Sequence, residues 1–226
     1  IRGCFLDGLD VAAPLAGKVQ TARNGVDRWL AAPVVKTPMV LFVGRMVPEK
    51  GILEFSQALA EVLQDYPEWS VVIVGARQFE TSKPGSYENR VAEALAPLGA
   101  RANMTGFLPL DKVKGLQQEA AIIGCPSIWE EPLGKTGLEA LAAGSALLTT
   151  RRGGIPEVAA GRAHIVDEPS PEAFATALRK LIGDDEYRAG LQQIAWDDFP
   201  FTATAMASVA DRIRIDAIKR SYNAGK

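Results

Sequence analysis

Hydrophobic residues along most of this chain alternate between short continuous runs and helix-like spacing. After the apolar run at 39–44, hydrophobic residues recur at the spacing of one helix face: Ile52, Phe55, Leu59 and Val62. Continuous apolar runs are typical of strands buried on both faces of a parallel sheet. Three such runs stand out: MVLFVG (39–44), SVVIVG (70–75) and AAIIGCP (120–126).

Weaker signals continue the same alternation to about residue 183. Val91, Ala94, Leu95 and Leu98 predict a second amphipathic helix, and Ser170 before Pro171 is a good helix start. Six strand signals alternating with helices predict an α/β fold, a Rossmann-like doubly wound parallel sheet of about six strands with helices on both faces. The remaining segments are strands RANMTGF (101–107), ALLTT (146–150) and AHIVD (163–167), and a short helix at LDKVKGLQQEA (110–120).

The two ends of the chain do not fit this pattern. Residues 1–37 hold no complete strand–helix unit and contain NGVD (24–27), a turn sequence. After DDFPF (197–201), apolar residues recur at helical spacing and predict a final amphipathic helix. We therefore expect a compact domain over 38–200, with a linker at each end to another part of the protein that is absent from this sequence.

Composition narrows the functional classes. With 47% apolar residues in 226, the chain can bury a substantial core. Its 25 Lys and Arg residues against 27 Asp and Glu provide no basic stripe, so nucleic acid is not expected as a partner. A small anionic ligand is compatible with this composition, because a few well-placed cations are enough to bind it. Cys4 and Cys125 lack the spacing of metal ligands, and His164 fits an ordinary residue at a strand edge.

No stretch resembles a signal peptide, and no apolar run approaches the length that crosses a bilayer. We therefore expect a cytoplasmic protein. Peripheral association with the inner face of the cytoplasmic membrane is left open.

The loop GRMVPEKG (44–51) follows the first strand and is the first candidate for chemistry. Ligands of open α/β sheets lie outside the carboxyl ends of the strands. Gly44 and Gly51 would let the backbone approach a ligand, and Arg45 and Lys50 could hold a diphosphate. The alternative is a glycine turn with two solvated basic side chains. The loop matches neither a Walker motif nor GxGxxG.

The segment EEPLGKTGLE (130–139) is the second candidate. Gly134 closes a turn, and a helix is expected to begin near Lys135, where free N–H groups could bind an anion. On that helix Glu139 could accept hydrogen bonds from a vicinal diol, and Glu131 could do so for a second hydroxylated group. The alternative is a Lys135–Glu139 ion pair on the surface, which carries little energy.

Two further loops, TGFL (105–108) and RRGGIPEV (151–158), would leave strand ends at the same edge. Each loop is a weak signal alone. Together they describe cations, free amides and hydroxyl-binding carboxylates, which suit a sugar attached to a nucleoside diphosphate.

Four motifs occur in the order found in retaining glycosyltransferases of family 4 (group 1), which have the GT-B fold: GRMVPEKG, VVIVG, CPSIWEEPLGKTGLEALAAG and RRGGIPEV. RNGVD (23–27) and FPFT (199–202) are similar to the linker and closing helix of that family. The resemblance implies the C-terminal half of a GT-B fold. Residues 1–37 would be the interdomain linker and tail of a missing N-terminal acceptor domain, 38–200 the nucleotide-sugar donor-binding domain, and 201–226 a helix returning toward the missing domain.

The resemblance also implies roles for individual residues. Leu133 stands where the family often has phenylalanine, and Lys135 where an aliphatic residue is commoner. Neither a metal nor a cofactor is expected. The implied catalytic residues are Arg45 and Lys50, beside the diphosphate, and Glu131, beside the donor sugar. The implied donor-binding residues are Gly44, Gly51, Phe107, Leu108, Leu133, Gly134, Lys135, Thr136 and Glu139, with Glu139 on the ribose and Phe107 or Leu108 near the base.

By the same resemblance, the whole enzyme would transfer a sugar, with retention, from a UDP or GDP sugar to a glycan or lipid-linked acceptor held by the missing domain. The fragment alone is expected to be inactive. Two alternatives stay open. One is a GT-B sugar-nucleotide epimerase or phosphorylase-like enzyme, which product analysis would separate. The other is a non-catalytic module that binds a sugar nucleotide.

Overall fold

The computed structural model describes residues 20–77 and 85–224. Its centre is a six-stranded sheet in the order β3-β2-β1-β4-β5-β6, and all neighbouring strands are parallel. This confirms the predicted parallel sheet. The strands are β1 (Thr37–Val43), β2 (Ser70–Val74), β3 (Ala102–Gly106), β4 (Ala120–Cys125), β5 (Ala146–Thr150) and β6 (Ala163–Val166).

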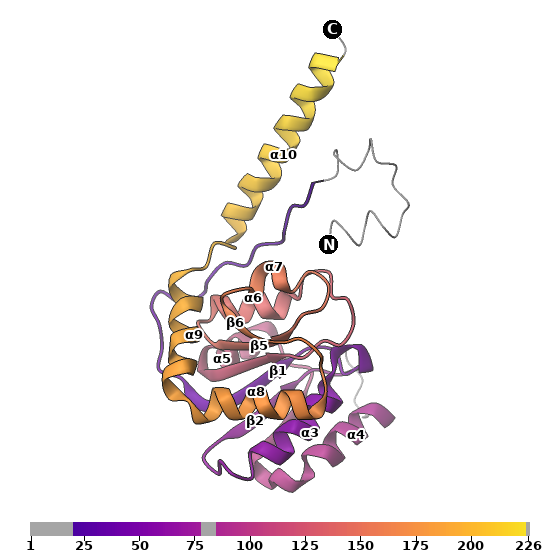
Figure 1. Cartoon of the computed structure of the whole chain (residues 1–226), viewed down its shortest axis with the longest axis vertical. Helices are drawn as coiled ribbons and strands as arrows, with labels where there is room; N and C mark the ends of the chain where they lie inside the picture. The colour runs from indigo at the N-terminus through magenta and orange to yellow at the C-terminus, as the bar shows by residue number, and fades with distance from the viewer. Residues whose placement is uncertain (1–19, 78–84, 225–226) are drawn as a thin grey trace. The chain divides into compact units, whose positions relative to one another are not determined.

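Helices cover both faces of this sheet (Figure 1). One face packs against α3 (Ile52–Val62), α4 (Ser86–Leu95) and α8 (Pro171–Gly183). The other packs against α5 (Leu110–Glu119), α6 (Lys135–Ala142) and α7 (Pro156–Ala159). Short 3-10 helices, η1 (Pro48–Lys50) and η2 (Ala96–Arg101), precede α3 and follow α4. The fold is the Rossmann-like α/β architecture predicted from the alternating pattern.

Successive residues of the central strand β1 serve the two cores in turn. Val40 and Phe42 belong to the cluster beneath α3 and α8, whereas Met39 and Leu41 belong to the cluster beneath α5 and α6. Side chains of a strand point alternately to opposite faces, so a strand covered on both faces must be apolar throughout. This is why MVLFVG contains no polar side chain.

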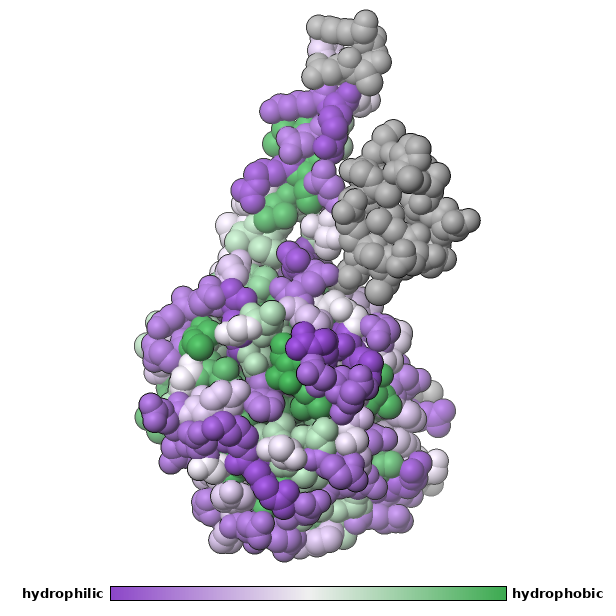
Figure 2. All heavy atoms as spheres, in the orientation of Figure 1, coloured by the Kyte–Doolittle hydropathy of each residue, from purple (hydrophilic) through white to green (hydrophobic). Residues whose placement is uncertain are grey.

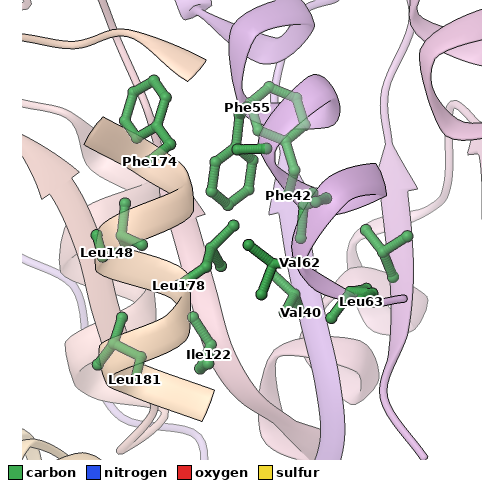
Figure 3. Close-up of a cluster of buried hydrophobic side chains, with 14 of the residues drawn as sticks. Val40, Phe42, Phe55, Val62, Leu63, Ile122, Leu148, Phe174, Leu178 and Leu181 are labelled. Atoms are coloured by element: carbon green, nitrogen blue, oxygen red, sulfur yellow. The ribbon is translucent and has the colours of Figure 1, made fainter. Parts of the chain in front are cut away.

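The larger core is centred on two phenylalanines from different helices (Figure 3). Phe55 of α3 and Phe174 of α8 are fully buried and meet edge to face, with ring centroids 5.6 Å apart. Leu178 of α8 and Ile122 of β4 belong to the same cluster. Outside the core, the face of the protein shown in Figure 2 is largely polar around smaller apolar areas.

The helix α9 (Asp185–Asp197) was not predicted from the sequence. Its start is well marked, because the Asp184 side chain accepts a hydrogen bond from the Tyr187 N–H. Only Leu191 and Ala195 of this helix are buried, however, so its apolar pattern is weak. The helix packs against β5, α6 and α8.

The described residues divide into two units: residues 29–77 with 85–199, and residues 20–28 with 200–224. In the described part of the second unit, the Val26 N–H donates to the Phe201 carbonyl (2.9 Å), and the Ala203 N–H donates to Asp27 Oδ1 (2.9 Å). The helix α10 (Ala203–Ala224) follows. Cys4 and the start of the expected linker lie outside the described residues, and the expected boundary at residue 37 falls inside the first unit. None of the described helices is both long and apolar enough to cross a bilayer.

Candidate functional site

The sheet order places a crevice between β1 and β4. The chain runs outward from β1 to β2 and β3, then returns to β4 on the other side of β1. At such a reversal the connections leave the carboxyl ends of the two strands in opposite directions, which opens a ligand-binding crevice. The loop 44–51 follows β1, and the loop 126–134 follows β4, so two of the predicted loops flank this crevice.

Two adjoining pockets open at this edge, and both are lined by Val43 and Gly44. We call them the β1–β2 pocket, of about 240 Å³, and the β1–α6 pocket, of about 50 Å³. The β1–β2 pocket is lined by Val43, Gly44, Arg45, Val74, Gly75, Ala76, Arg77, Phe107, Leu108 and Val113. The β1–α6 pocket is lined by Phe42, Val43, Gly44, Lys50, Cys125, Pro126, Ser127, Glu131, Gly134, Lys135, Thr136 and Ile155.

Lys50 and Glu131 form the central contact of the β1–α6 pocket. The Lys50 ammonium lies 2.5 Å from Glu131 Oε2, and the two side chains are 24% and 14% exposed. The same carboxylate oxygen accepts hydrogen bonds from the Trp129 indole N–H (3.0 Å) and the Ser127 hydroxyl (3.2 Å). The cation and the carboxylate, predicted separately as phosphate and sugar contacts, therefore form one charge-paired unit.

These contacts decide the charge of Glu131. Burial alone would raise the pKa of the Glu131 carboxyl. The hydrogen bond and positive charge of Lys50 oppose this effect, together with the hydrogen bonds from Trp129 and Ser127, and the net result is a lowered pKa. Glu131 is therefore an anion at neutral pH and does not hold a proton to donate. This agrees with a positioning role rather than one as a proton donor.

A close backbone contact brings Lys50 and Glu131 together. Gly51 has φ +64°, and a Cβ at this position would lie 2.0 Å from the Pro126 carbonyl oxygen. The Ile128 N–H donates to the Glu49 carbonyl at 3.0 Å, which adds a second link between the two loops. Glycine is thus required by both conformation and space. Gly51 lines neither pocket, and its predicted role in approaching a ligand stays a prediction.

The loop of the RRGGIPEV motif contacts the main chain of Glu131. The Gly154 N–H donates to the Glu131 carbonyl at 2.7 Å, and a Cβ on Gly153 would lie 2.2 Å from the same oxygen. Of this loop, only Ile155 lines the β1–α6 pocket. The motif therefore fixes the backbone of Glu131.

The start of α6 faces the β1–α6 pocket. The helix begins at Lys135 after Gly134, as predicted, and Gly134, Lys135 and Thr136 all line the pocket. The Thr136 hydroxyl donates to the Val43 carbonyl at 3.2 Å, so the first turn is tied to the end of β1. N–H groups in a first helical turn have no acceptor within the helix and carry partial positive charge, which favours anions.

Glu139 and Leu133 lie differently from the other predicted residues. Neither lines either pocket, and the Leu133 side chain is buried. Glu139 Oε2 accepts a hydrogen bond from Gln117 Nε2 of α5 at 3.1 Å. Its Oε1 is 3.7 Å from the Lys135 ammonium, so the alternative ion pair is present, with Lys135 71% exposed. The ribose role of Glu139 stays a prediction.

The β1–β2 pocket contains the remaining predicted residues. Phe107 and Leu108 form part of its wall after β3, and Phe107 is 52% exposed. Arg45 is exposed and lines the pocket after β1. Arg77, after β2, is a second arginine there that the sequence reasoning missed. It lies two residues after the end of the strand run SVVIVG, and that position could have signalled it.

Within residues 20–77 and 85–224, no three His, Cys, Asp or Glu side chains gather in a way that could hold a metal ion. Burial raises the pKa of the Cys125 thiol to about 12, with smaller effects from Lys50 and the nearby glutamates. The thiol beside the β1–α6 pocket is therefore neutral and is not a nucleophile at physiological pH. The charged groups lining that pocket are Lys50, Glu131 and Lys135.

Comparison with known proteins decides the family. The sequence profile described as "Glycosyl transferases group 1" matches residues 27–196. The chain belongs to the group 1 glycosyltransferases. The match includes the four candidate loops and all residues that line the two pockets.

Individual glycosyltransferases support this assignment. A D-inositol 3-phosphate glycosyltransferase of Corynebacterium efficiens is 31% identical over 205 residues, covering 88% of this chain and 47% of the relative. The crystal structure of the C-terminal domain of a group 1 family protein from Francisella tularensis is 26% identical, with a TM-score of 0.64, and covers 76% of this chain and 95% of that domain. This likeness identifies the fold as the C-terminal half of GT-B.

A second similar structure, from Anabaena, was solved in complex with UDP-glucose. It has a TM-score of 0.64 at 19% identity and covers 81% of this chain and 49% of its own. This likeness concerns the fold alone. The first curated relatives are matched over only 37% to 47% of their own length, so the chain spans less than half of each of them.

Proposed function

We propose that this chain is the donor-binding half of a retaining glycosyltransferase, which transfers a sugar from a nucleoside diphosphate sugar to an acceptor. One observation carries the proposal: Lys50, Glu131 and the start of α6 line one pocket at the reversal of the sheet, and Arg45 lines the adjoining pocket. Cations and free amides suit a diphosphate, and a carboxylate suits sugar hydroxyls.

Loss of the diphosphate is the step for which this geometry is suited. When the bond from the sugar to the diphosphate breaks, negative charge develops on the departing phosphate. Lys50, Arg45 and the first-turn amides of α6 would stabilise that charge with groups already fixed in place. In this scheme the side chains take the role that a divalent cation has in other phosphate-transferring enzymes.

The Lys50–Glu131 pair would contact both the phosphate and the sugar of the donor. Lys50 would contact the phosphate, while Glu131, held as an anion, would accept hydrogen bonds from the sugar. Placing both groups in one charge-paired unit fixes the distance between phosphate and sugar contacts, which favours correct positioning of the breaking bond.

The β1–β2 pocket would receive the nucleoside. It shares Val43 and Gly44 with the β1–α6 pocket, which holds the proposed phosphate-binding groups. It is largely apolar and includes the exposed Phe107. UDP and GDP are the proposed carriers. UDP-glucose is the first donor to test, because the similar Anabaena protein was solved with it. Glu139, one turn into α6, would approach the ribose hydroxyls.

The acceptor would be a glycan or a lipid-linked saccharide held by an N-terminal domain that this chain does not include. The partial coverage of the curated relatives supports this division. Residues 1–37 would form the tail and linker of that domain, 38–200 the donor-binding domain, and 201–226 a returning helix. We propose a cytoplasmic enzyme that works at the inner face of the membrane where the acceptor is lipid-linked.

Isothermal titration of the folded chain with UDP, GDP and their glucose conjugates tests the proposal. We expect saturable binding of at least one nucleotide, and weaker diphosphate binding after Lys50→Ala, with nucleoside binding little changed. No binding of any of the four ligands to protein shown to be folded would refute donor binding. If the full-length protein binds the donor but yields an epimerised sugar nucleotide or no product, glycosyl transfer is refuted instead.

A further inference from the structure

We propose that Trp129 is a positioning residue that determines which oxygen of Glu131 is presented to the donor sugar. The inference rests on the proposed function, since it concerns the same site. Trp129 lies two residues before Glu131, and its indole N–H donates to Glu131 Oε2 at 3.0 Å. Although it is an aromatic residue, it is 43% exposed, so core packing does not account for it.

All three donors to the Glu131 carboxylate converge on one of its oxygens. Lys50, Ser127 and Trp129 each contact Oε2, at 2.5, 3.2 and 3.0 Å. Among the described residues, no hydrogen bond to Oε1 is recorded. A carboxylate oxygen offers about two lone-pair sites, so three donors compete for those of Oε2, while Oε1 keeps its accepting capacity. The arrangement assigns Oε2 to the protein and Oε1 to the substrate.

The three donors are not equivalent. The Ser127 hydroxyl also lies 3.1 Å from the Glu49 carbonyl, and a hydroxyl carries one proton, so it can donate to only one of these acceptors at a time. Lys50 is assigned to the departing phosphate and would divide its hydrogen bonds when the donor binds. The indole N–H has a single proton and a single recorded acceptor. Trp129 is therefore the donor that stays on Oε2 throughout.

Two consequences follow for the nucleotide sugar. A fixed Oε2 orients the carboxylate plane, so the hydrogen bond from a sugar hydroxyl to Oε1 is made without further ordering. The Trp129 hydrogen bond also favours the charged form of Glu131, which is the form that accepts from a hydroxyl. Both consequences concern the sugar, and neither concerns the nucleoside or the diphosphate.

The substitution Trp129→Phe removes the N–H and keeps an aromatic ring. We expect the pKa of the Glu131 carboxyl, measured by carbon NMR titration of the 226-residue chain, to rise. In isothermal titration, UDP-glucose affinity should fall by up to about tenfold, because the carboxylate must then be ordered when the sugar binds. UDP affinity should change by less than about twofold. GDP and GDP-glucose run in parallel cover the second candidate base.

Trp196→Phe is the matched control, because Trp196 lines a separate pocket with Lys36 before β1. It should change neither the pKa of Glu131 nor the affinity for UDP-glucose. An unchanged pKa and unchanged UDP-glucose affinity in Trp129→Phe would overturn the inference. So would an equal loss of UDP and UDP-glucose affinity, which indicates a structural role. A loss seen only in Trp129→Ala would overturn it too, since the ring and not the N–H would then matter.

The test separates this inference from the proposed function. If the folded wild-type chain binds none of the four ligands, the proposed function fails and the inference fails with it. If the wild-type chain binds UDP-glucose or GDP-glucose and Trp129→Phe binds it equally well, only the inference fails.

Discussion

Replacing Lys50 by methionine should destabilise the fold through Glu131. The substitution keeps much of the aliphatic length of Lys50 and removes the ammonium that lies 2.5 Å from Glu131 Oε2. An exposed ion pair contributes about 0–1 kcal/mol, whereas removing one partner of a buried pair costs about 3–5 kcal/mol. With side-chain exposures of 24% and 14%, this pair lies between these limits. Because Trp129 and Ser127 stay on Glu131, we expect a loss of about 2 kcal/mol at pH 7.

The pH dependence of that loss has a definite sign. The folded-state pKa of Glu131 lies below its ordinary value of 4.5. Its charge therefore stabilises the fold fully above about pH 4.5, and this stabilisation is lost as the pH falls through the folded-state value. The difference between wild type and Lys50→Met should shrink over the same range. In Lys50→Met the ammonium no longer opposes the effect of burial on the Glu131 carboxyl. The pKa of Glu131 should therefore be higher than in the wild type.

Urea unfolding followed by circular dichroism at a series of pH values measures both effects. Lys180→Met is the matched control, because the Lys180–Asp184 pair has the same 2.5 Å separation but side chains 50% and 37% exposed. It should change stability much less than Lys50→Met. Equal losses in the two variants, or a Lys50→Met loss that does not depend on pH below 4.5, would show that the Lys50–Glu131 pair is not the stabilising contact described here.

Other substitutions test the contacts that build the site. Gly51→Ala should cost more than about 2 kcal/mol, since both the positive φ and the Pro126 carbonyl oppose a Cβ, whereas Gly161→Ala, at φ +74° with open space, should cost only about 1 kcal/mol. Thermal unfolding compares them, and equal costs would exclude the close contact as the cause. Lys36→Met removes hydrogen bonds of 2.8 and 2.7 Å to the carbonyls of Gln118 and Ala143 and should cost about 2 kcal/mol without changing nucleotide affinity. A changed affinity would contradict the separation of this contact from the donor site.

Much of the fold could be predicted because its signals are local. Continuous apolar runs identify β1, β2 and β4, and the cap formed by Ser170, whose hydroxyl accepts from the Ala173 N–H, marks the start of α8. The helix α9 was missed because few of its residues are buried and its surface is polar over most of its length. Periodicity reports burial, so a helix that is buried along a narrow stripe gives little signal.

The candidate site was only partly predictable for a different reason. The residue types in the loops after β1 and β4 indicated cations and carboxylates, but Lys50 and Glu131 are separated by 81 positions in the sequence. Their pairing depends on the sheet order, which places β4 beside β1 and cannot be obtained from periodicity. The same holds for the contact of Gln117 with Glu139, between α5 and α6. The spacing of the glycines did not indicate that Gly51 and Gly153 lie where two backbone segments pack closely together.

Amide NMR shifts on titration with UDP or GDP test most directly whether the donor site lies at the reversal of the sheet. Our account predicts that the amides of Gly44, Lys50 and Thr136 shift together and saturate at one ligand concentration. The amides of Lys36 and Gly144, which precede β1 and β5 at the opposite edge, should stay unchanged. Saturable shifts centred on Lys36 and Gly144, with Gly44, Lys50 and Thr136 unaffected, would contradict it.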